Sequence, residues 1–514
     1  MPKRIADALA WHASSTPNKL AVVDAQRSLD YSQLWRRVCR MANALRARAI
    51  GPGDRVAILM ANSATYLEVY HALALLGAAA VPLNFRYVAP EIEFVVNHSE
   101  AKALVLDRAY MAIVAGIRAS MSSLGDNYLV TGEADVGPGW TQLEGEVAKA
   151  SEAAPPVAAD VENCFFQGYT AGTTGVPKGC VNPQKGFVDF FKRLAWHYNI
   201  RSTDVEITPA PLFHEAPTLY SMLQIFVGGA VVVTDDPKPA AILDLIARHN
   251  VTWGFMVPTM WESLVNSQEI HSADVSSMRL LVSAGAPLLS HTKEALLKWF
   301  PNAGLNEFYG GTEVGVVTNL GAEDQRRKVR SVGRPIIGFR VKLLDENRNE
   351  APTGEVGEIF INGPILIREY YKNPDADKAA RHGDWFSLGD VGRFDDEGYL
   401  YIVDRKKDMI ITGGENVFPA EIERVLYLHP SVAMAAVVGI PDDQWGERIL
   451  AAIVLREGRT ADAAELTSHC RKHLAGFKAP RQFEFVEQLP MSSFGKILRR
   501  EVRAPYWKKQ AAQV

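Results

Sequence analysis

The chain has 514 residues, 47% of them apolar, and a formal net charge of −4. That length and apolar content suffice for a large buried core and for more than one domain. The small negative charge offers no electrostatic basis for binding nucleic acid. The four cysteines lie far apart without CxxC spacing, which argues against a disulfide scaffold or a zinc site and suits a reducing cytosol; they are Cys39, Cys164, Cys180 and Cys470.

The N-terminus and the longest apolar run both argue against membrane targeting. Asp7 precedes any long apolar segment, so we expect no secretory signal. The run from His71 to Leu83 is too short and too rich in Gly and Ala to span a bilayer. We expect a cytoplasmic protein without stable membrane insertion.

Short apolar strand candidates alternate with helical patterns through most of the chain, which predicts an α/β fold with a large N-terminal domain of helix-covered sheets. The expected strands are 55–60, 103–106, 230–233, 252–256 and 280–283, and the expected helices include 65–76 and 240–247. The stretch 132–160 is rich in Gly, Ala, Pro and Glu, and we expect a polar surface connector there.

A Gly- and Thr-rich loop spans Thr170 to Gly179 and offers backbone N–H groups, hydroxyls and one cation, Lys178, to an anion. This chemistry suits phosphate. The loop is not a Walker motif, because no Ser or Thr follows Lys178 and the glycine spacing differs. Taken alone, such a loop is more often an ordinary surface turn.

Two later motifs add groups that a nucleotide needs. The run Tyr309 to Glu313 combines an aromatic ring that can stack on a purine with a carboxylate that can hold Mg²⁺. Asp390, in Ser-Leu-Gly-Asp, is a candidate for accepting hydrogen bonds from ribose hydroxyls. Individually, Tyr309 could be a core aromatic, Glu313 a solvated charge and Asp390 a turn residue, but their order along the chain would then be unexplained.

A charged cluster at 404–408 marks a change of pattern. The remaining hundred or so residues are enough for a small independent domain. An expected strand at 399–403 ends at the cluster, and the expected elements after it are 409–411, 420–428, 434–439, 449–455, 461–474 and 482–486. On its own the cluster could equally be a solvated turn.

Seven motifs in one order carry a specific resemblance. They are 170–179, 211–214 (Pro-Leu-Phe-His), 309–313, 387–390, 404–408, 413–416 (Gly-Gly-Glu-Asn) and 493–496 (Ser-Phe-Gly-Lys). With them the chain resembles, nearly end to end, the adenylate-forming superfamily of acyl-CoA synthetases, luciferases and peptide-synthetase adenylation domains. It is similar in particular to the acyl-CoA synthetase branch, with its fatty-acid, 4-chlorobenzoate and 4-coumarate CoA ligases.

The resemblance implies a two-step reaction. A carboxylate first attacks the α-phosphorus of ATP to give an acyl adenylate, and the thiol of coenzyme A then takes the acyl group. It also implies an N-terminal domain at 1–403, a hinge at 404–408 centred on Lys407, and a mobile C-terminal α+β domain at 409–514. That domain would rotate so that Lys496 leaves the active site and the Gly413-Gly414 pair enters it.

The implied site residues fall into three groups. Lys496, Glu313 and His214 are the catalytic candidates, and Glu313 is also the Mg²⁺ ligand. The implied ATP- and CoA-binding residues are Thr170, Gly172, Thr173, Thr174, Gly175, Lys178, Tyr309, Gly310, Thr312, Asp390, Arg405, Gly413, Gly414, Trp445, Phe477, Lys478 and Arg481. Trp445 as core filler and Lys478 as a solvated charge remain alternatives. Ala479 stands where a relative carries a cation.

The substrate is the least determined part. By resemblance the acyl pocket is lined by Phe213, His214, Thr218, Leu219, Ala284, Gly310, Gly311 and Val316, with Gly310 and Gly311 leaving room for bulk. This composition suits an apolar monocarboxylic acid. We expect a fatty-acid CoA ligase. An aryl or cinnamate-type acid, or loading of a carrier protein, is the alternative, and a homodimer is left open.

Overall fold

The computed structural model describes residues 2–132, 135–157, 159–170, 177–412, 415–442, 445–491 and 497–511, with the backbone alone at 415–416 and 508–511. The chain divides into two compact units. Unit 1 comprises Met1–Val329, Gly333–Arg340 and Ile361–Phe386, and unit 2 comprises Arg330–Val332, Val341–Phe360 and Ser387–Val514. The expected hinge at 404–408 lies within unit 2, and its hinge role stays a prediction.

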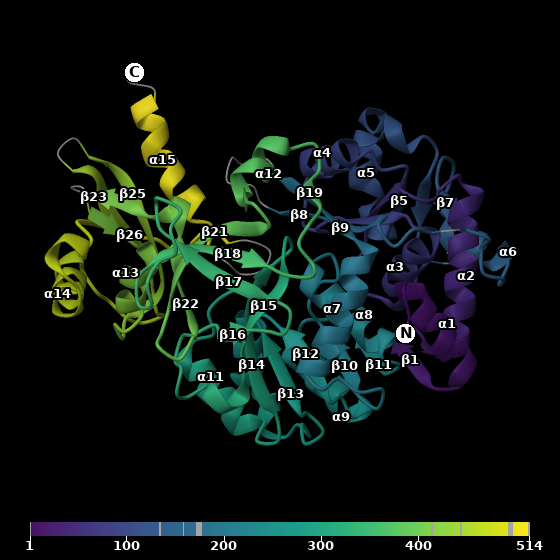
Figure 1. The fold of residues 1–514 in the computed structure, drawn as a ribbon, viewed down its shortest axis with the longest axis horizontal. Helices are drawn as coiled ribbons and strands as arrows, with labels where there is room; N and C mark the ends of the chain where they lie inside the picture. Colours follow the sequence, from purple (N-terminus) through teal and green to yellow (C-terminus); the bar gives the residue numbers. More distant parts are fainter. Residues whose placement is uncertain are drawn as a thin grey trace. The chain divides into compact units, whose positions relative to one another are not determined.

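Unit 1 is built on two large sheets (Figure 1). The nine-stranded sheet has the order β16 (Arg334–Pro335), β15 (Gly315–Leu320), β14 (Gly304–Gly311), β13 (Leu280–Ser283), β12 (Trp253–Met256), β10 (Val205–Thr208), β11 (Ala230–Val233), β1 (Leu20–Val23) and β2 (Ser28–Asp30). The eight-stranded sheet has the order β19 (Glu369–Tyr370), β9 (Lys178–Pro183), β8 (Cys164–Thr170), β4 (Ala79–Pro82), β3 (Arg55–Leu59), β5 (Ala103–Leu106), β6 (Tyr128–Val130) and β7 (Thr141–Gln142).

Helices lie between and outside these sheets. In Figure 1, α7 (Gln184–His197) runs beside α8 (Glu215–Phe226); α7 packs on β8 and β9, and α8 packs on β10, β11 and β12, so this pair separates the two sheets. The other helices of unit 1 are α1 (Ile5–Ser15), α2 (Tyr31–Ala47), α3 (Ala64–Leu76), α4 (Ala89–Ser99), α5 (Met111–Ile117), α6 (Leu143–Lys149), α9 (Pro239–His249), α10 (Pro258–Val265), α11 (Ser290–Trp299) and α12 (Pro374–Ala380).

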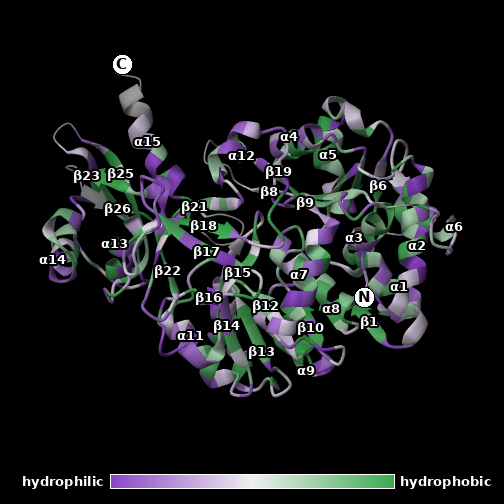
Figure 2. Ribbon diagram, in the orientation of Figure 1, coloured by the Kyte–Doolittle hydropathy of each residue, from purple (hydrophilic) through white to green (hydrophobic). Residues whose placement is uncertain are grey.

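Burial explains the sequence pattern. Every residue of β4, β5, β12 and β13 is buried, as expected for strands of a largely parallel sheet covered on both faces. The helix α3 is buried on all sides, capped by the Ser63 hydroxyl, which accepts from the Tyr66 N–H, and ended by Gly77 at φ +70°. Figure 2 shows the same contrast, with green apolar residues along β13 and purple residues on α9.

The predicted elements of unit 1 are present within one or two residues of their expected ends, but the expected connector at 132–160 differs. It contains β7 and the helix α6, whose Leu143 and Val147 are buried and whose Glu144 binds Arg37 of α2 at 3.0 Å. A short helix with two apolar positions one turn apart leaves only a weak signal among Gly and Pro, which is why we expected a loop.

Unit 2 holds most of a five-stranded sheet and all of another. The first has the order β17 (Arg340–Leu344), β18 (Gly357–Asn362), β21 (Trp385–Phe394) and β20 (Arg381–His382), with β22 (Leu400–Arg405) paired to β21. The second has the order β24 (Glu415–Val417), β23 (Ile410–Thr412), β26 (Gly446–Leu455) and β25 (Val432–Asp442), with β27 (Gln482–Phe485) paired to β26. Its helices are α13 (Pro419–Leu426), α14 (Ala463–His473) and α15 (Arg499–Ala511).

One strand of unit 2 ends later than expected. We expected it to stop at Val403, before the charged cluster, but β22 continues through Asp404 and Arg405 because Arg405 pairs across the ladder with Asp390. Within the described residues of the whole chain, no helix combines the length and the apolar character needed to cross a membrane.

Candidate active site

The stems of the Gly- and Thr-rich loop are the adjoining ends of β8 and β9. These strands are antiparallel, and Thr170 and Lys178 face each other across the ladder. The hairpin therefore fixes both ends of the loop. Gly172, Thr173, Thr174 and Gly175, which we predicted to bind phosphate, lie outside the described residues.

Glu313 lies at the centre of a group of side chains from both sheets of unit 1. Glu313 is only 9% exposed, and its Oε1 atom accepts a hydrogen bond from the Tyr370 hydroxyl at 2.9 Å and one from Thr170 Oγ1 at 3.3 Å. The Glu313 carbonyl also accepts from the Ile367 N–H at 2.9 Å. The structure thus brings together two motifs that are more than 140 residues apart in the sequence.

Tyr370 is a member of this site that sequence reasoning missed. It lies in β19, which pairs antiparallel with β9 so that Tyr370 faces Cys180. Burial, followed by the Glu313 charge, raises the pKa of the Tyr370 hydroxyl, so it stays protonated and donates. The Lys178 ammonium lies 4.6 Å from the centre of the Tyr370 ring, close enough for a cation–π contact.

Two further acidic groups adjoin Glu313. Burial raises the pKa of the Cys180 thiol well above its usual range, and the Glu313 charge adds to that effect. Burial and then Glu313 likewise raise the pKa of Glu215, and Glu215 Oε1 has no hydrogen-bond partner. Among the described residues, no Lys, Arg or His forms an ion pair with Glu313 or Glu215. The described part of the chain therefore supplies no ion pair to these two carboxyl groups, although Lys178 lies over the neighbouring Tyr370 ring.

The donor set fits a magnesium ion. Mg²⁺ prefers hard oxygen ligands and is usually held by one or two carboxylates together with substrate phosphates. The buried Glu313 carboxylate supplies such a ligand, and the acid groups around it would be stabilised by a divalent cation. Its role as the magnesium ligand stays a prediction.

His214 ends the Pro-Leu-Phe-His motif and immediately precedes α8, whose first turn begins at Glu215. Its ring lies 4.1 Å from that of Phe213, centre to centre. Burial, followed by the nearby Arg86 charge, lowers the pKa of His214 well below its usual range, so the imidazole is neutral at neutral pH. A neutral ring can donate or accept one proton but cannot supply positive charge, and its catalytic role stays a prediction.

Gly310 does not leave the space for acyl bulk that we expected, and its contact with the nucleotide stays a prediction. A Cβ atom at this position would lie 1.8 Å from the carbonyl oxygen of Gly315 on the neighbouring strand β15. The register between β14 and β15 shifts between Tyr309 and Gly310, so the two backbones approach closely there. Gly310 is required by this close approach, and the room beside its Cα is filled by backbone and cannot admit acyl bulk.

The remaining predicted residues of unit 1 sit nearby. Tyr309 is half-buried in β14 and faces Thr318 across the ladder. The Thr312 carbonyl accepts a hydrogen bond from Asn182 Nδ2 at 3.2 Å, which links the Tyr-Gly-Gly-Thr-Glu run to β9. Their nucleotide contacts stay predictions.

Unit 2 contains the other predicted residues. Asp390 and Arg405 form an ion pair at 3.3 Å on adjacent strands. The Arg481 guanidinium lies 4.2 Å from the Trp445 ring centre, and the Lys478 ammonium is held by the Glu421 carboxylate at 2.8 Å. Phe477 is 40% exposed. The predicted residues Gly413, Gly414 and Lys496 lie outside the described residues.

Comparisons with known proteins agree with this arrangement. The family model for AMP-binding enzymes matches residues 9–371, and the model for the AMP-binding enzyme C-terminal domain matches residues 421–496. A feruloyl-CoA synthase of an Amycolatopsis species is 35% identical over 96% of this chain and 96% of its own. The long-chain-fatty-acid–CoA ligase FadD13 of Mycobacterium tuberculosis is 34% identical over 98% of this chain and 99% of its own.

A solved structure of another enzyme has the same fold. The ATP-bound MatB of Rhodopseudomonas palustris superposes with a TM-score of 0.88 at 31% identity, covering 98% of this chain and 99% of that one. The expected α/β fold and the expected superfamily are thereby confirmed. The chain belongs to the AMP-binding enzyme family, in its branch of AMP-forming acid–thiol ligases that use ATP, Mg²⁺ and coenzyme A.

Proposed function

We propose that this enzyme activates an apolar monocarboxylic acid of the fatty-acid type as an acyl adenylate and transfers the acyl group to coenzyme A. The observation that supports the assignment of the site most strongly is the convergence of Thr170 and Tyr370 on the buried Glu313 carboxylate. That cluster joins the stem of the phosphate loop to the Tyr-Gly-Gly-Thr-Glu run within the part of the chain that the AMP-binding model matches.

The chemistry explains why two steps are needed. A free carboxylate is a poor acyl donor because its leaving group would be oxide, so it must first displace pyrophosphate from ATP. Negative charge accumulates at the α-phosphate during that displacement, and positive charge placed there in advance lowers the barrier. Bound Mg²⁺ would supply part of this charge by neutralising the phosphate oxygens.

The chain's own residues would divide the remaining work. Thr170 and Tyr370 hold Oε1 of Glu313 and thereby fix the orientation of this carboxylate. Lys178, which pairs with Thr170 at the end of the loop, would attract phosphate, and Lys496 would stabilise the charge at the α-phosphorus. In the second step Lys496 would leave, and the Gly413-Gly414 pair would admit the pantetheine arm through rotation about 404–408.

Charge supports the choice of a monocarboxylic acid. Glu215 is buried beside Glu313 with no described cation to pair it, and the buried Lys293 is already neutralised by Glu307 at 2.5 Å. A second carboxylate on the substrate would therefore meet acid groups and no free cation among these residues. The name of the FadD13 relative agrees with a fatty acid.

An aryl or cinnamate-type acid is the second candidate, because the relative with 35% identity is a feruloyl-CoA synthase. A panel of fatty, cinnamic and benzoic acids, assayed for pyrophosphate release with and without coenzyme A, decides between them. We expect the largest kcat/KM for a fatty acid. A cinnamic acid that exceeds every fatty acid would reverse the choice.

Separating the two half-reactions tests the role of Lys496. Lys496→Ala should slow acyl-adenylate formation by about a hundredfold or more, because a transition-state charge contact is lost. Thioester formation from a chemically supplied acyl adenylate should continue near the parent rate, because this lysine would act in the first step only. An equal loss in both half-reactions would show that Lys496 does not act in the first step only.

Two further assignments belong to the proposal. The four cysteines are all free thiols, which agrees with a cytoplasmic location. The short turn η6 (Lys406–Asp408) follows β22 within the segment we assign as the hinge. Lys407→Pro fixes φ at that position, and we expect it to slow thioester formation more than adenylation.

A further inference from the structure

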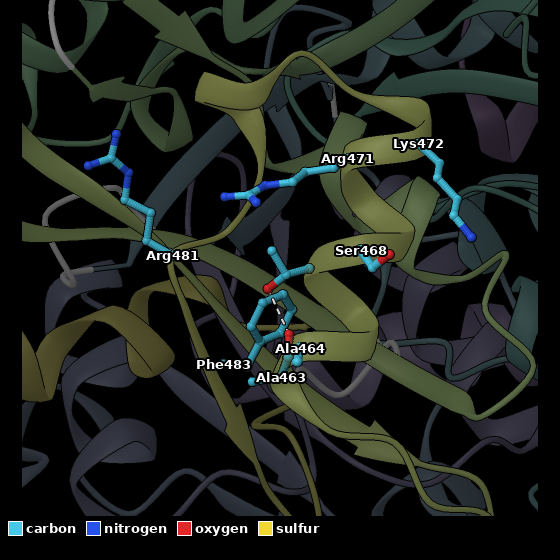
Figure 3. A pocket seen from close by; sticks show the side chains of 8 residues that line it. Ala463, Ala464, Ser468, Arg471, Lys472, Arg481 and Phe483 are labelled. Atoms are coloured by element: carbon cyan, nitrogen blue, oxygen red, sulfur yellow. Dashed lines mark hydrogen bonds between the residues drawn. The ribbon is translucent and has the colours of Figure 1, made fainter.

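Two polar clusters lie outside the group of side chains around Glu313. One is the groove of unit 2 between α14 and β27, where Figure 3 shows the Arg471 guanidinium extending toward the side where Arg481 stands. Because we predict that Arg481 binds coenzyme A, that groove belongs to the site already described. The other cluster lies in unit 1, beside the stem of the phosphate loop. It consists of Arg55 on β3, His98 on α4, Gln167 and Tyr169 on β8, and Tyr371 directly after β19.

Tyr169 and Thr170 are the last two residues of β8, so their side chains point to opposite faces of the hairpin. On one face, Thr170 donates to Glu313 at 3.3 Å. On the other face, Tyr169 lies opposite Gly179 of β9. A Cβ atom at Gly179 would lie 3.0 Å from the Tyr169 ring and 3.1 Å from the Gln167 amide nitrogen. Gly179 therefore leaves this face open for the two side chains.

The hydrogen bonds of the cluster run in one direction. Arg55 Nε donates to Gln167 Oε1 at 2.9 Å, and because an arginine can only donate, the other end of the Gln167 amide must be its NH₂ group. That group donates to the Tyr169 hydroxyl oxygen at 3.2 Å. The Tyr169 hydroxyl lies 2.8 Å from His98 Nδ1 and directs its own proton to that nitrogen. His98 is therefore the neutral tautomer with its proton on Nε2.

Three aromatic rings hold the half-buried His98 ring. Phe94 stacks on it at 5.3 Å between ring centres, and the rings of Tyr169 and Tyr371 meet it edge to face at 5.7 and 5.8 Å. Tyr371 is itself fixed, because the Arg55 guanidinium lies 4.2 Å from its ring centre. A ring held in this way presents Nδ1 to the Tyr169 hydroxyl in one orientation.

Packing alone does not explain this cluster. Apolar side chains at positions 98 and 169 would fill the same space without the cost of burying polar groups, and Gln167 is fully buried. A chain of hydrogen bonds fixes orientation as well as volume. The strand end that it orients carries Thr170, which faces Lys178 across the ladder. The Tyr371 N–H also donates to the Gly179 carbonyl at 2.7 Å, so the cluster holds both strands of the stem.

We propose that His98 is a positioning residue for ATP. By accepting the hydrogen bond of Tyr169 it fixes the end of β8, and thereby holds Thr170 and Lys178 in the arrangement that binds the phosphates. This role rests on the proposed function, since it requires the phosphates of ATP to bind at the stem of this hairpin. His98 itself touches neither the substrates nor the metal.

The test removes the hydrogen bond and then restores it. His98→Leu should raise the Kd for MgATP, measured by titration calorimetry, and the KM for ATP roughly fivefold, because one hydrogen bond is lost. The kcat and the KM for the acid, measured by pyrophosphate exchange, should stay within about twofold. His98→Asn places an acceptor oxygen near the position of Nδ1 and should restore both ATP constants to within about twofold. Failure of asparagine to restore them would mean that His98 acts by packing and would overturn the proposal.

Tyr169→Phe removes the other partner of the same bond and keeps the aromatic packing. It should raise the Kd for MgATP by a similar factor, and the double variant with His98→Leu should be no weaker than either single variant. His291→Leu is the control, because His291 on α11 pairs with Glu262, outside the hairpin, and its loss should change neither ATP constant. Parent-like affinity for MgATP in both single variants would also overturn the proposal.

Acid pH gives a second readout. A proton on Nδ1 of His98 would displace the hydrogen bond from Tyr169. Burial and then the Lys372 charge lower the pKa of His98, whereas Glu100 opposes this shift, so the ring is neutral at neutral pH. The titratable and charged groups around the ring are Tyr169, Tyr371, Glu100 and Lys372, with Arg55 beyond the Tyr371 ring. The Kd for MgATP should therefore rise toward about pH 5 more steeply in the parent than in His98→Asn. Equal steepness in the two proteins would contradict the proposed role of Nδ1.

The two measurements separate this proposal from the proposed function. If the parent catalyses no acid-dependent pyrophosphate exchange with any acid of the panel, the proposed function fails, and calorimetry with MgATP still tests the role of His98. If exchange proceeds in the parent and His98→Leu and Tyr169→Phe bind MgATP as the parent does, the proposed function stands and the positioning role of His98 is wrong.

Discussion

Two clusters of buried carboxylates in this molecule are organised in opposite ways. In unit 1, Glu313 receives hydrogen bonds from hydroxyl groups and forms no ion pair among the described residues. In unit 2, one guanidinium, that of Arg499, binds Asp404, Asp408 and Glu423 at 2.8, 3.4 and 2.5 Å. We therefore expect the Arg499 cluster, which contains its own counter-ion, to be structural, and the Glu313 cluster to hold a cation that arrives with the substrate.

The ionisation of the two clusters follows from this difference. Burial lowers the pKa of Arg499. The charges of Glu423, Asp404 and Asp408 raise this pKa by more than burial lowers it, so the guanidinium stays charged. In unit 1 the carboxyl of Glu215 has a pKa raised by burial and by Glu313, so it tends to hold its proton. Glu206 on β10 is a second example, because burial raises its pKa to about 8 although the Thr208 and Ser221 hydroxyls oppose the shift.

The largest effect on stability should come from Glu206. Its folded pKa of about 8 lies above the ordinary value of 4.5, so the folded state holds a proton that the unfolded state releases between these values. Stability should therefore fall as pH rises from about 5 to 8, by at most roughly 5 kcal/mol. Glu206→Gln should match the parent near pH 5 and exceed it increasingly toward pH 8. The melting temperatures of both proteins are measured across this pH range. A difference between them that stays constant with pH would show that Glu206 is ionised in the folded state.

Removing the counter-ion of unit 2 should have the next largest effect. Arg499→Leu leaves the buried Asp404 and Glu423 without a cation and should destabilise unit 2 by about 4 kcal/mol. Arg503→Leu is the matched control, because the one ion pair of Arg503 among the described residues is with Glu447 and the side chain, which lies 4.5 Å from the Trp507 ring centre, is more exposed, so its loss should cost less than about 1 kcal/mol. Limited proteolysis during a thermal ramp reports on unit 2. Similar protection of both variants would mean that the Arg499 cluster is not structural.

Glu313→Gln should change the rate much more than the stability, the opposite of what we expect for Arg499→Leu. The amide keeps an oxygen for the Thr170 and Tyr370 hydroxyls, so we expect the Tm to change by no more than about 3 °C. Acyl-adenylate formation should fall by about a hundredfold, because an amide is a poor ligand for Mg²⁺. If instead the melting temperature drops and the rate is retained, the Glu313 cluster is structural and the comparison with Arg499 fails.

Local chemistry decided which parts of the site could be predicted from sequence. Thr170 and Glu313 stand in motifs whose residue types suit phosphate and Mg²⁺, so each was predicted before any contact was known. Tyr370 was missed because its role depends on the pairing of β19 with β9, about 190 residues apart in the sequence, and no neighbouring residue suggests it. Glu215 was also missed, although it is the one charged residue of α8 and directly follows His214.

Gly310 and the helix α6 are two further features that could not be predicted correctly from the sequence. From the sequence we expected Gly310 to leave room for the acyl group, but the approach of β15 shows that backbone occupies that space. In α6, two buried positions in seven residues fall below what periodicity can detect, so the packing against α2 could not be foreseen. The alternation of strands and helices elsewhere was readable because long buried strands need continuous apolar runs.

In the proposed reaction the carboxylate of the acid attacks the α-phosphorus of ATP. An acid accepted by the enzyme and labelled with ¹⁸O in its carboxylate tests this directly, because the bond formed in the adenylate leaves one carboxylate oxygen on phosphorus when the thiol displaces AMP. After turnover with coenzyme A, mass spectrometry should find one ¹⁸O atom in AMP and none in pyrophosphate. Label in inorganic phosphate with ADP as co-product, or unlabelled AMP, would contradict the account.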